Sequence, residues 1–337
     1  MTMDTPSEPA GPFVARRDTQ SGSPIKVLYI GGLGRTGSTL LDRVLGQIPG
    51  FSSVGELREI WTNGLGENRQ CGCGAPFREC PFWTEVGLSA FGGWARLDAK
   101  EVARLAASVE RHRFVPVMLA PGLSPSYQRR TTRYLSYLSR LYSAIQEVAG
   151  SRVIVDSSKA PAYAYLLRRI SELDLHVLHL VRDSRGIAYS WSKFVPTRDT
   201  FEQTAYLERY SPVRVSARYL SRNALVELLA KFGTPTMRVR YESFIQTPPQ
   251  QIRSVLDFLK ERVGDSQLAF ISDHQVDLGI NHTVQGNPVR MHLGPLDLRL
   301  DNDWMVSMPA RQTLIVSALT FPFLRRYGYS WSGRIHP

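Results

Sequence analysis

The sequence predicts an α/β fold whose central, mostly parallel sheet carries helices on both faces. Two observations lead to this fold class. Short apolar runs of strand length alternate along the chain with longer segments in which apolar residues recur at helical spacing. The strand candidates are apolar almost throughout, which is typical of parallel strands that are covered by helices on either side.

The first predicted unit is a strand, a loop and a helix. The run KVLYIG at 26–31 ends in glycine, and leucines at positions 40, 41 and 45 give the segment 38–47 helical spacing. Residues 127–149 place tyrosine and leucine on one face and predict a long amphipathic helix. The further elements expected are a strand at 152–156, a helix at 161–172, a strand at 175–181, a helix from about Ser184, a strand at 236–241, a helix at 248–263 and a C-terminal helix at 309–326.

Residues 25–330 are expected to form a single domain, because no internal repeat divides them. Two stretches interrupt the alternation of strands and helices. Residues 61–98, rich in glycine, cysteine and tryptophan, predict an irregular insertion, and residues 277–308 predict a long loop. Residues 1–24 are rich in proline, serine and threonine and have no apolar core of a signal peptide, so they predict a disordered leader.

The composition points to an anionic ligand. The 337 residues include 41 lysines and arginines against 30 acidic residues, a formal net charge of +11. Such a surface attracts nucleic acid, acidic lipid and phosphorylated or sulfated small molecules. No lysine-rich tail or repeated basic motif is present, so we expect no nucleic-acid partner. No window approaches the roughly 18 apolar residues of a membrane span, and we expect a cytoplasmic protein without a transmembrane segment.

The stretch GGLGRTGSTLL at 31–41 predicts an anion-binding loop between a strand and a helix. Its glycines let the backbone approach a phosphate, Ser38 and Thr39 add hydroxyl donors, and Arg35 adds a permanent positive charge. The alternative is a tight turn that packs the helix on the strand. The lysine of an ATP-binding loop is missing, because Ser38 occupies its position. The loop therefore favours a donor with a singly charged transferable group, such as the sulfuryl group of an adenosine phosphosulfate.

A donor of this type, 3′-phosphoadenosine 5′-phosphosulfate, needs a second anion site for its 3′-phosphate. The stretch HLVRDSRGIAYSWSK at 179–193 supplies candidates in Arg182, at the end of a strand, and Ser190, in the following helix. The alternative is that Arg182 caps the sheet edge and that Ser190 is an ordinary helix residue.

Four segments in order resemble the sulfotransferase family. GRTGSTLLDRVLG and VRDSRGIAYS resemble its 5′-phosphosulfate loop and 3′-phosphate motif. RYESFIQTPPQQIRSVLDFLK resembles the segment whose tyrosine, here Tyr241, abuts the adenine. GNPVR at 286–290, with Trp304, resembles the C-terminal segment that closes over the 3′-phosphate in bacterial members, although the R-K-G triplet of cytosolic animal enzymes is absent. The resemblance covers roughly residues 26–327 and implies a P-loop-NTPase-like sulfotransferase fold, with 277–308 as the cofactor-closing loop.

The resemblance also implies catalytic residues. Sulfuryl transfer to a hydroxyl needs a base for the acceptor proton and cations for the developing charge. Glu56 follows a glycine and lies 21 residues after Arg35. In tyrosylprotein-type sulfotransferases, a Gly-Glu pair at similar spacing after the loop arginine carries the catalytic glutamate, so this resemblance makes Glu56 the expected base. Lys159 resembles a lysine that assists the leaving phosphate in the tyrosylprotein-type enzymes. The alternative interpretation is that Lys159 is an ordinary surface lysine near the start of a helix. His112 is the substitute base by analogy with the histidine of cytosolic animal enzymes.

Together these observations predict a sulfotransferase that uses 3′-phosphoadenosine 5′-phosphosulfate. The predicted residues are Arg35, Thr36, Gly37, Ser38 and Thr39 at the phosphosulfate, Arg182, Ser190, Asn287 and Arg290 at the 3′-phosphate, Tyr241 at the adenine, and Glu56, Lys159 and Arg35 in catalysis. The acceptor is a hydroxyl of a small molecule, sugar, lipid or peptide, bound by 61–130 and 194–232. The rivals are a P-loop kinase that uses ATP and Mg²⁺ and a non-catalytic protein that binds nucleotide or nucleic acid. The sequence leaves the oligomeric state open.

The three cysteines of the chain lie close together, at Cys71, Cys73 and Cys80. Their C-x-C spacing differs from the usual zinc knuckle, and His112 is the nearest histidine that follows them in the sequence. We therefore expect a structural thiol cluster or a local disulfide, and no metal.

Overall fold

A five-stranded sheet, parallel throughout, forms the centre of the described chain. The computed structural model describes residues 24–194, 196–197, 205–206 and 208–331. The strands run in the order β2-β3-β1-β4-β7, and each neighbouring pair is parallel. Their bounds are β1 Ile25–Gly32, β2 Phe51–Gly55, β3 Val153–Lys159, β4 Leu173–Val181 and β7 Thr236–Arg240. The predicted α/β fold class is confirmed.

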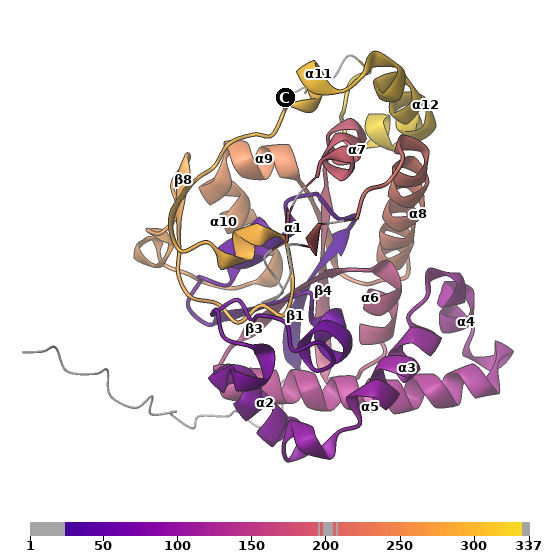
Figure 1. The fold of residues 1–337 in the computed structure, drawn as a ribbon, viewed down its shortest axis with the longest axis vertical. Helices are drawn as coiled ribbons and strands as arrows, with labels where there is room; N and C mark the ends of the chain where they lie inside the picture. The colour runs from indigo at the N-terminus through magenta and orange to yellow at the C-terminus, as the bar shows by residue number, and fades with distance from the viewer. Residues whose placement is uncertain (1–23, 195, 198–204, 207, 332–337) are drawn as a thin grey trace, which may run out of the picture.

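Helices cover both faces of this sheet, as Figure 1 shows. The alternation of side chains along β1 explains why both faces are apolar. Val27 and Tyr29 face one layer, which contains α5 (Pro125–Ala149), α6 (Pro161–Leu167) and α8 (Pro212–Lys231). Leu28 and Ile30 face the other, which contains α1 (Ser38–Leu45) and α10 (Pro248–Leu259).

Further elements extend these two layers. Beside the first layer lie α2 (Pro81–Phe91), α3 (Ala99–Val109) and α4 (Val115–Leu119), at the end of the molecule crossed by α5 in Figure 1. A third apolar cluster joins α8 to α7 (Ser184–Ser192), α11 (Trp304–Ser307) and α12 (Ala310–Arg326). The remaining α-helix is α9 (Tyr241–Gln246). The remaining strands form two short antiparallel pairs, β5 (Pro196–Thr197) with β6 (Ala205–Tyr206) and β8 (Gln275–Leu278) with β9 (Gly294–Asp297).

The structure changes several expected boundaries. The helix expected at 161–172 ends at Leu167, and the helix expected at 248–263 ends at Leu259, where Lys260 takes a left-handed backbone conformation. The segment 61–98 is not irregular throughout, because α2 begins at Pro81 and buries Trp83 and Val86. All but the last residue of the expected leader 1–24 lies outside the described residues. Among the residues that the structure describes, no helix combines the length and the apolar character of a bilayer span.

The segment between β8 and α11 lies against the N-terminal part of the chain. The guanidinium group of Arg43, on α1, is buried and donates to four carbonyl oxygens of this segment. The acceptors are those of Gly279 (2.6 Å), Arg290 (2.7 Å), Val289 (3.1 Å) and His292 (3.1 Å). These bonds hold the segment close to the loop that precedes α1.

Because all five strands are parallel, their carboxyl ends lie at one edge of the sheet. Ligands of open parallel sheets bind at this edge. The residues that directly follow or end the strands are the glycine loop after β1, Glu56 after β2, Lys159 at the end of β3, Arg182 after β4 and Tyr241 after β7. Most of the predicted site residues therefore lie at five strand ends, and the exceptions are Ser190 on α7 and Asn287 and Arg290 in the β8–α11 segment.

Candidate active site

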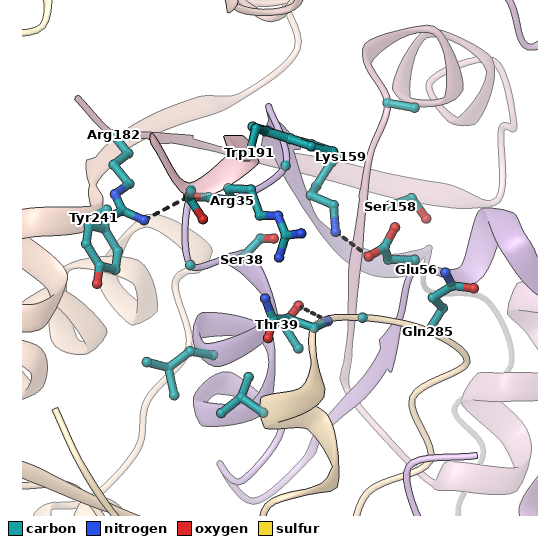
Figure 2. Close-up of a pocket in the computed structure, with 18 of the residues that line it drawn as sticks. Arg35, Ser38, Thr39, Glu56, Ser158, Lys159, Arg182, Trp191, Tyr241 and Gln285 are labelled. Carbon is teal, nitrogen blue, oxygen red and sulfur yellow. Dashed lines mark hydrogen bonds and ion pairs between the residues drawn. The ribbon is translucent and has the colours of Figure 1, made fainter. Parts of the chain in front are cut away.

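A cavity of about 560 Å³ opens at the carboxyl edge of the sheet. It collects most of the residues that the sequence predicted for the site. Arg35, Gly37, Ser38, Thr39, Glu56, Lys159, Arg182, Ser190, Tyr241 and Asn287 all line it. Figure 2 shows Glu56 and Lys159 on one side of the cavity and Arg182 and Tyr241 on the other, with Arg35 and Ser38 between them.

The loop between β1 and α1 forms the centre of the cavity wall. Gly37 has a φ of 83°, and a Cβ at this position would lie 2.7 Å from the ring of Tyr241. Glycine is therefore required here by both the backbone conformation and the close approach of the ring. The turn places Ser38 and Thr39, which both line the cavity, in the first turn of α1, where the backbone N–H groups have no acceptor within the helix.

Thr36 differs from its neighbours in the loop. Its hydroxyl donates a hydrogen bond to the carbonyl oxygen of Leu33 at 3.0 Å, and its side chain is buried. It is not among the described residues that line the cavity. The side chain of Thr36 thus stabilises the loop internally, and a contact with an anion would have to come from its backbone.

Arg35 lies between the two sides of the cavity. Its backbone has a φ of 71°, and its guanidinium carbon lies 5.1 Å from the centre of the Trp191 ring. Burial lowers the pKa of Arg35, while the Glu56 carboxylate opposes this shift. Trp191 was not predictable as a site residue, because an aromatic residue inside a helix is most often part of the core.

Glu56 and Lys159 form an ion pair with a distance of 2.5 Å between Oε1 and Nζ. Lys159 ends β3 with a φ of 64°, a rare conformation for lysine. The N–H group of Glu56 donates to the carbonyl oxygen of Gln285 at 3.2 Å, which connects the end of β2 to the β8–α11 segment. The structure therefore brings two of the three predicted catalytic residues, Glu56 and Lys159, together.

The buried carboxylate of Asp156 stabilises the end of β3, the strand that carries Lys159. Asp156, within β3, accepts hydrogen bonds from the Tyr142 hydroxyl at 2.5 Å and from the Ser158 N–H group at 2.8 Å. Ser158 in turn accepts from the N–H group of Arg58 at 3.0 Å. Burial raises the pKa of Asp156 to about 6, although its hydrogen bonds favour the ionised form. This chain of contacts fixes the end of β3 relative to the residues that follow Glu56.

Arg182 connects the loop to the far side of the cavity. Its Nη1 donates to the carbonyl oxygen of Arg35 at 3.0 Å, and its Nη2 forms an ion pair with Asp301 at 2.9 Å. Its guanidinium carbon lies 4.4 Å from the centre of the Tyr241 ring. Ser190 lines the same cavity from α7. Asp301, which the sequence did not identify, pairs with the cation expected at the 3′-phosphate.

Asn287 and Arg290 differ in their positions. Asn287 lines the cavity, and its N–H group donates to the Thr39 hydroxyl at 3.1 Å. Arg290 is fully buried, and its guanidinium donates to the carbonyl oxygens of Thr283 at 3.1 Å and Gln70 at 2.6 Å. It is not among the described lining residues. The expectation that Arg290 reaches the cavity is corrected, because its guanidinium cross-links two backbone segments instead.

Three arginines that the sequence did not identify, Arg58, Arg218 and Arg222, also line the cavity. Burial and the nearby Arg218 lower the pKa of Arg222. His112, the substitute base, lies near this group, and burial lowers its pKa to about 4. It is not one of the described residues of the cavity wall. No local sequence pattern joins all three arginines, because Arg58 follows β2, whereas Arg218 and Arg222 lie one turn apart on α8.

The structure decides between the two arrangements expected for the cysteines. Cys71, Cys73 and Cys80 are free thiols, so they form the expected thiol cluster and not the local disulfide. The histidine that lies beside them is His282, which is 202 residues after Cys80. The long separation in the sequence concealed this histidine, so no fourth possible ligand was evident beside the three cysteines.

Comparison with known proteins identifies the family. A profile described as the sulfotransferase family matches residues 28–265, which is more than half of the chain. The chain therefore belongs to the sulfotransferase family. A search of curated proteins gave no match.

Solved sulfotransferase structures are similar to this chain. The sulfotransferase domain of the olefin synthase from Synechococcus PCC 7002 matches with a TM-score of 0.50 and 19% sequence identity, over 92% of this chain and 98% of that one. A sulfotransferase domain from the curacin biosynthetic pathway has a TM-score of 0.48 and 17% identity, over 89% of this chain and 99% of that one. The sulfotransferase STF9 from Mycobacterium avium has a TM-score of 0.47 and 12% identity, over 93% and 79%.

Proposed function

We propose that this protein moves a sulfuryl group from 3′-phosphoadenosine 5′-phosphosulfate to a hydroxyl group of an acceptor. The observation that carries the proposal is the Glu56–Lys159 pair at 2.5 Å, which lines the same cavity as Arg35 and the glycine loop. A base, a cation for the leaving group and an anion-binding loop are the parts that this transfer requires. Membership of the sulfotransferase family supports the same reaction.

In the proposed reaction, the acceptor oxygen attacks the sulfur atom in line with the oxygen of the 5′-phosphate. The new S–O bond forms as the old one breaks, and the electron pair of the broken bond stays on the phosphate oxygen. Adenosine 3′,5′-bisphosphate leaves, and Glu56 takes the proton of the acceptor hydroxyl. Lys159 and Arg35 stabilise the negative charge on the sulfuryl oxygens and on the leaving phosphate.

The proposed donor lies across the glycine loop. Its phosphosulfate binds to the N–H groups that begin α1 and to the hydroxyls of Ser38 and Thr39. Its 3′-phosphate binds to Arg182 and Ser190, and its adenine contacts Tyr241. Asn287 adds a cavity contact next to Thr39. The buried Arg290 takes no part in this arrangement.

A binding experiment tests the donor. We expect adenosine 3′,5′-bisphosphate to raise the melting temperature of the protein in the absence of Mg²⁺, because the cavity supplies permanent cations. ATP with Mg²⁺ should have little effect, because the loop lacks the lysine that contacts the terminal phosphates. The reverse result would favour a kinase and overturn the proposal. Binding of the bisphosphate without transfer of radiolabelled sulfuryl groups to any acceptor in a broad hydroxyl panel would favour a non-catalytic protein.

A further inference from the structure

The three cysteines and His282 form a compact set of four possible metal ligands. Their ligand atoms all lie within 4.8 Å of one another. Cys73 Sγ and Cys80 Sγ are 3.7 Å apart, while His282 Nδ1 lies 3.3 Å from Cys80 Sγ and 3.9 Å from Cys71 Sγ. Cys71 and Cys80 are fully buried. These four side chains meet although the sequence separates them into two distant groups.

The distances fit a tetrahedral zinc ion. Zinc lies about 2.3 Å from cysteine sulfur and about 2.0–2.1 Å from histidine nitrogen. In a tetrahedron with these bond lengths, two sulfurs are about 3.8 Å apart, and a sulfur and a nitrogen are about 3.5 Å apart. The Cys73–Cys80 and Cys80–His282 distances agree with these values to within a few tenths of an ångström. A disulfide would bring two sulfurs to about 2.05 Å, far closer than the 3.7 Å of the structure.

The backbone around the cluster is held in a way that presents the four ligands together. The N–H group of Cys71 donates to the carbonyl oxygen of Ala75 at 2.8 Å, which closes a tight turn around Cys73. The indole N–H group of Trp83 donates to the carbonyl oxygen of His282 at 2.9 Å. The His282 ring stacks on Phe82, with ring centres 4.9 Å apart. The histidine therefore has a fixed orientation relative to the cysteines.

We propose that Cys71, Cys73, Cys80 and His282 bind one structural zinc ion. Three thiolates and one imidazole are a ligand set typical of zinc, and four protein ligands leave no open position for a substrate. On binding, the three thiols release their protons and His282 coordinates through its neutral Nδ1. The ion fastens the segment that begins at residue 61 to the segment that follows β8.

The proposed zinc ion also affects the position of residues in the cavity wall. Three residues after His282, Gln285 accepts a hydrogen bond from the N–H group of Glu56 at 3.2 Å. Gln285 and Gly286 line the cavity, and a Cβ at Gly286 would lie 2.9 Å from Thr39. A zinc ion at His282 would therefore fix one end of the cavity wall, at a distance from the reacting groups.

Metal content tests the site directly. The full chain, purified without chelator, is expected to carry about one zinc ion per chain by elemental analysis. Replacement of zinc by Co²⁺ is expected to give the strong visible bands of a tetrahedral cobalt ion and the near-ultraviolet bands of thiolate ligands. Less than about a tenth of an ion per chain, both as purified and after incubation with Zn²⁺, would overturn the proposal. So would a Cys73–Cys80 disulfide in protein prepared without oxygen.

Variants test the ligands. Cys73→Ser and His282→Ala are each expected to lower the zinc content several-fold and to lower the melting temperature. His274→Ala is the matched control, because His274 is exposed in the nearby β8 region and should keep the full zinc content. If the ligand variants do not fold, the cobalt spectrum of the unaltered chain still decides between the outcomes. Retention of zinc by both ligand variants would contradict the assignment.

Discussion

The ammonium group of Lys159 lies 2.5 Å from the carboxylate that we propose as the base. The pair is largely shielded from water, with side-chain exposures of 11% for Lys159 and 21% for Glu56. An interaction of two opposite charges is stronger in such surroundings than at the surface. A donor phosphate that draws Lys159 toward itself would free Glu56 to accept the proton. The two proposed roles are thus linked through one contact.

Glu56→Gln separates binding from chemistry. The amide cannot accept the acceptor proton, so we expect kcat to fall by about 10²–10⁴-fold. The affinity for adenosine 3′,5′-bisphosphate should change by less than about threefold, because the phosphate contacts come from other residues. Transfer assays and calorimetric titration of the bisphosphate measure the two effects.

Glu59→Gln is the matched comparison. Glu59 lines the same cavity, but its carboxylate pairs with Arg58 at 2.6 Å. If Glu59→Gln loses activity while Glu56→Gln retains it, the base has been assigned to the wrong carboxylate.

At the scale of elements, the connection from β1 to α1 decides the shape of the cavity. Arg35 and Gly37 both have positive φ, at 71° and 83°, so the chain turns sharply before Ser38. Tyr241, which begins α9 after the far strand β7, packs against this turn. Two elements that are distant in the sequence therefore share one packing contact at the proposed adenine position.

Gly37→Ala tests this contact. A Cβ 2.7 Å from the Tyr241 ring, at a φ of 83°, has to shift either the loop or the ring. We expect a loss of about 1–3 kcal/mol in the free energy of unfolding. The dissociation constant of adenosine 3′,5′-bisphosphate should increase by about tenfold or more, because the loop no longer presents its N–H groups together. Urea denaturation and calorimetry provide the measurements.

Gly122→Ala is a control of the same chemical size. A Cβ at Gly122 meets no atom within 4 Å, and its φ is not in the positive range. It should leave both the unfolding free energy and the bisphosphate affinity nearly unchanged. Equal effects from the two substitutions would show that the contact with Tyr241 has no special importance.

The elements also show what the sequence was able to predict. Four of the five sheet strands and helices α1, α5, α6, α7, α10 and α12 were predicted, because apolar runs and helical spacing are local patterns. Strand β2 and the long helix α8 were not predicted. Helix α2 was missed because glycine and cysteine dominate the segment that precedes it. Asp301 and Arg222 were not predictable, since no local pattern announces a residue whose role depends on contacts across the fold. His282 was missed for the same reason, despite the clear cysteine cluster.

The fold of the whole molecule buries several ionisable groups, and burial disfavours their charged forms. Asp42, on α1, is fully buried and accepts a hydrogen bond from Ser53, while its Oδ1 has no hydrogen-bond partner. Burial raises its pKa from 3.8 to about 8. The native state therefore binds more protons than the unfolded state between these two values, and stability falls as the pH rises through this range.

The raised pKa of Asp42 predicts how the stability of the whole molecule depends on pH. Between about pH 5 and pH 7, the Asp42 carboxyl should lower the free energy of unfolding by up to about 1.4 kcal/mol per pH unit. Asp42→Asn removes the titration, so the dependence of stability on pH should become flatter in this range. Urea denaturation of both proteins at several pH values measures the slopes. Identical slopes would mean that Asp42 ionises in the folded protein near its usual pKa.

Arg182 already pairs with an anionic side chain of the same protein, the carboxylate of Asp301. Its bond to Asp301, at 2.9 Å, places a carboxylate of the same chain where the 3′-phosphate is proposed to bind. A tethered carboxylate is present at a high effective concentration and does not diffuse away. Entry of the donor is then an exchange of one anion for another, and its affinity depends on how readily the chain around Asp301 gives way.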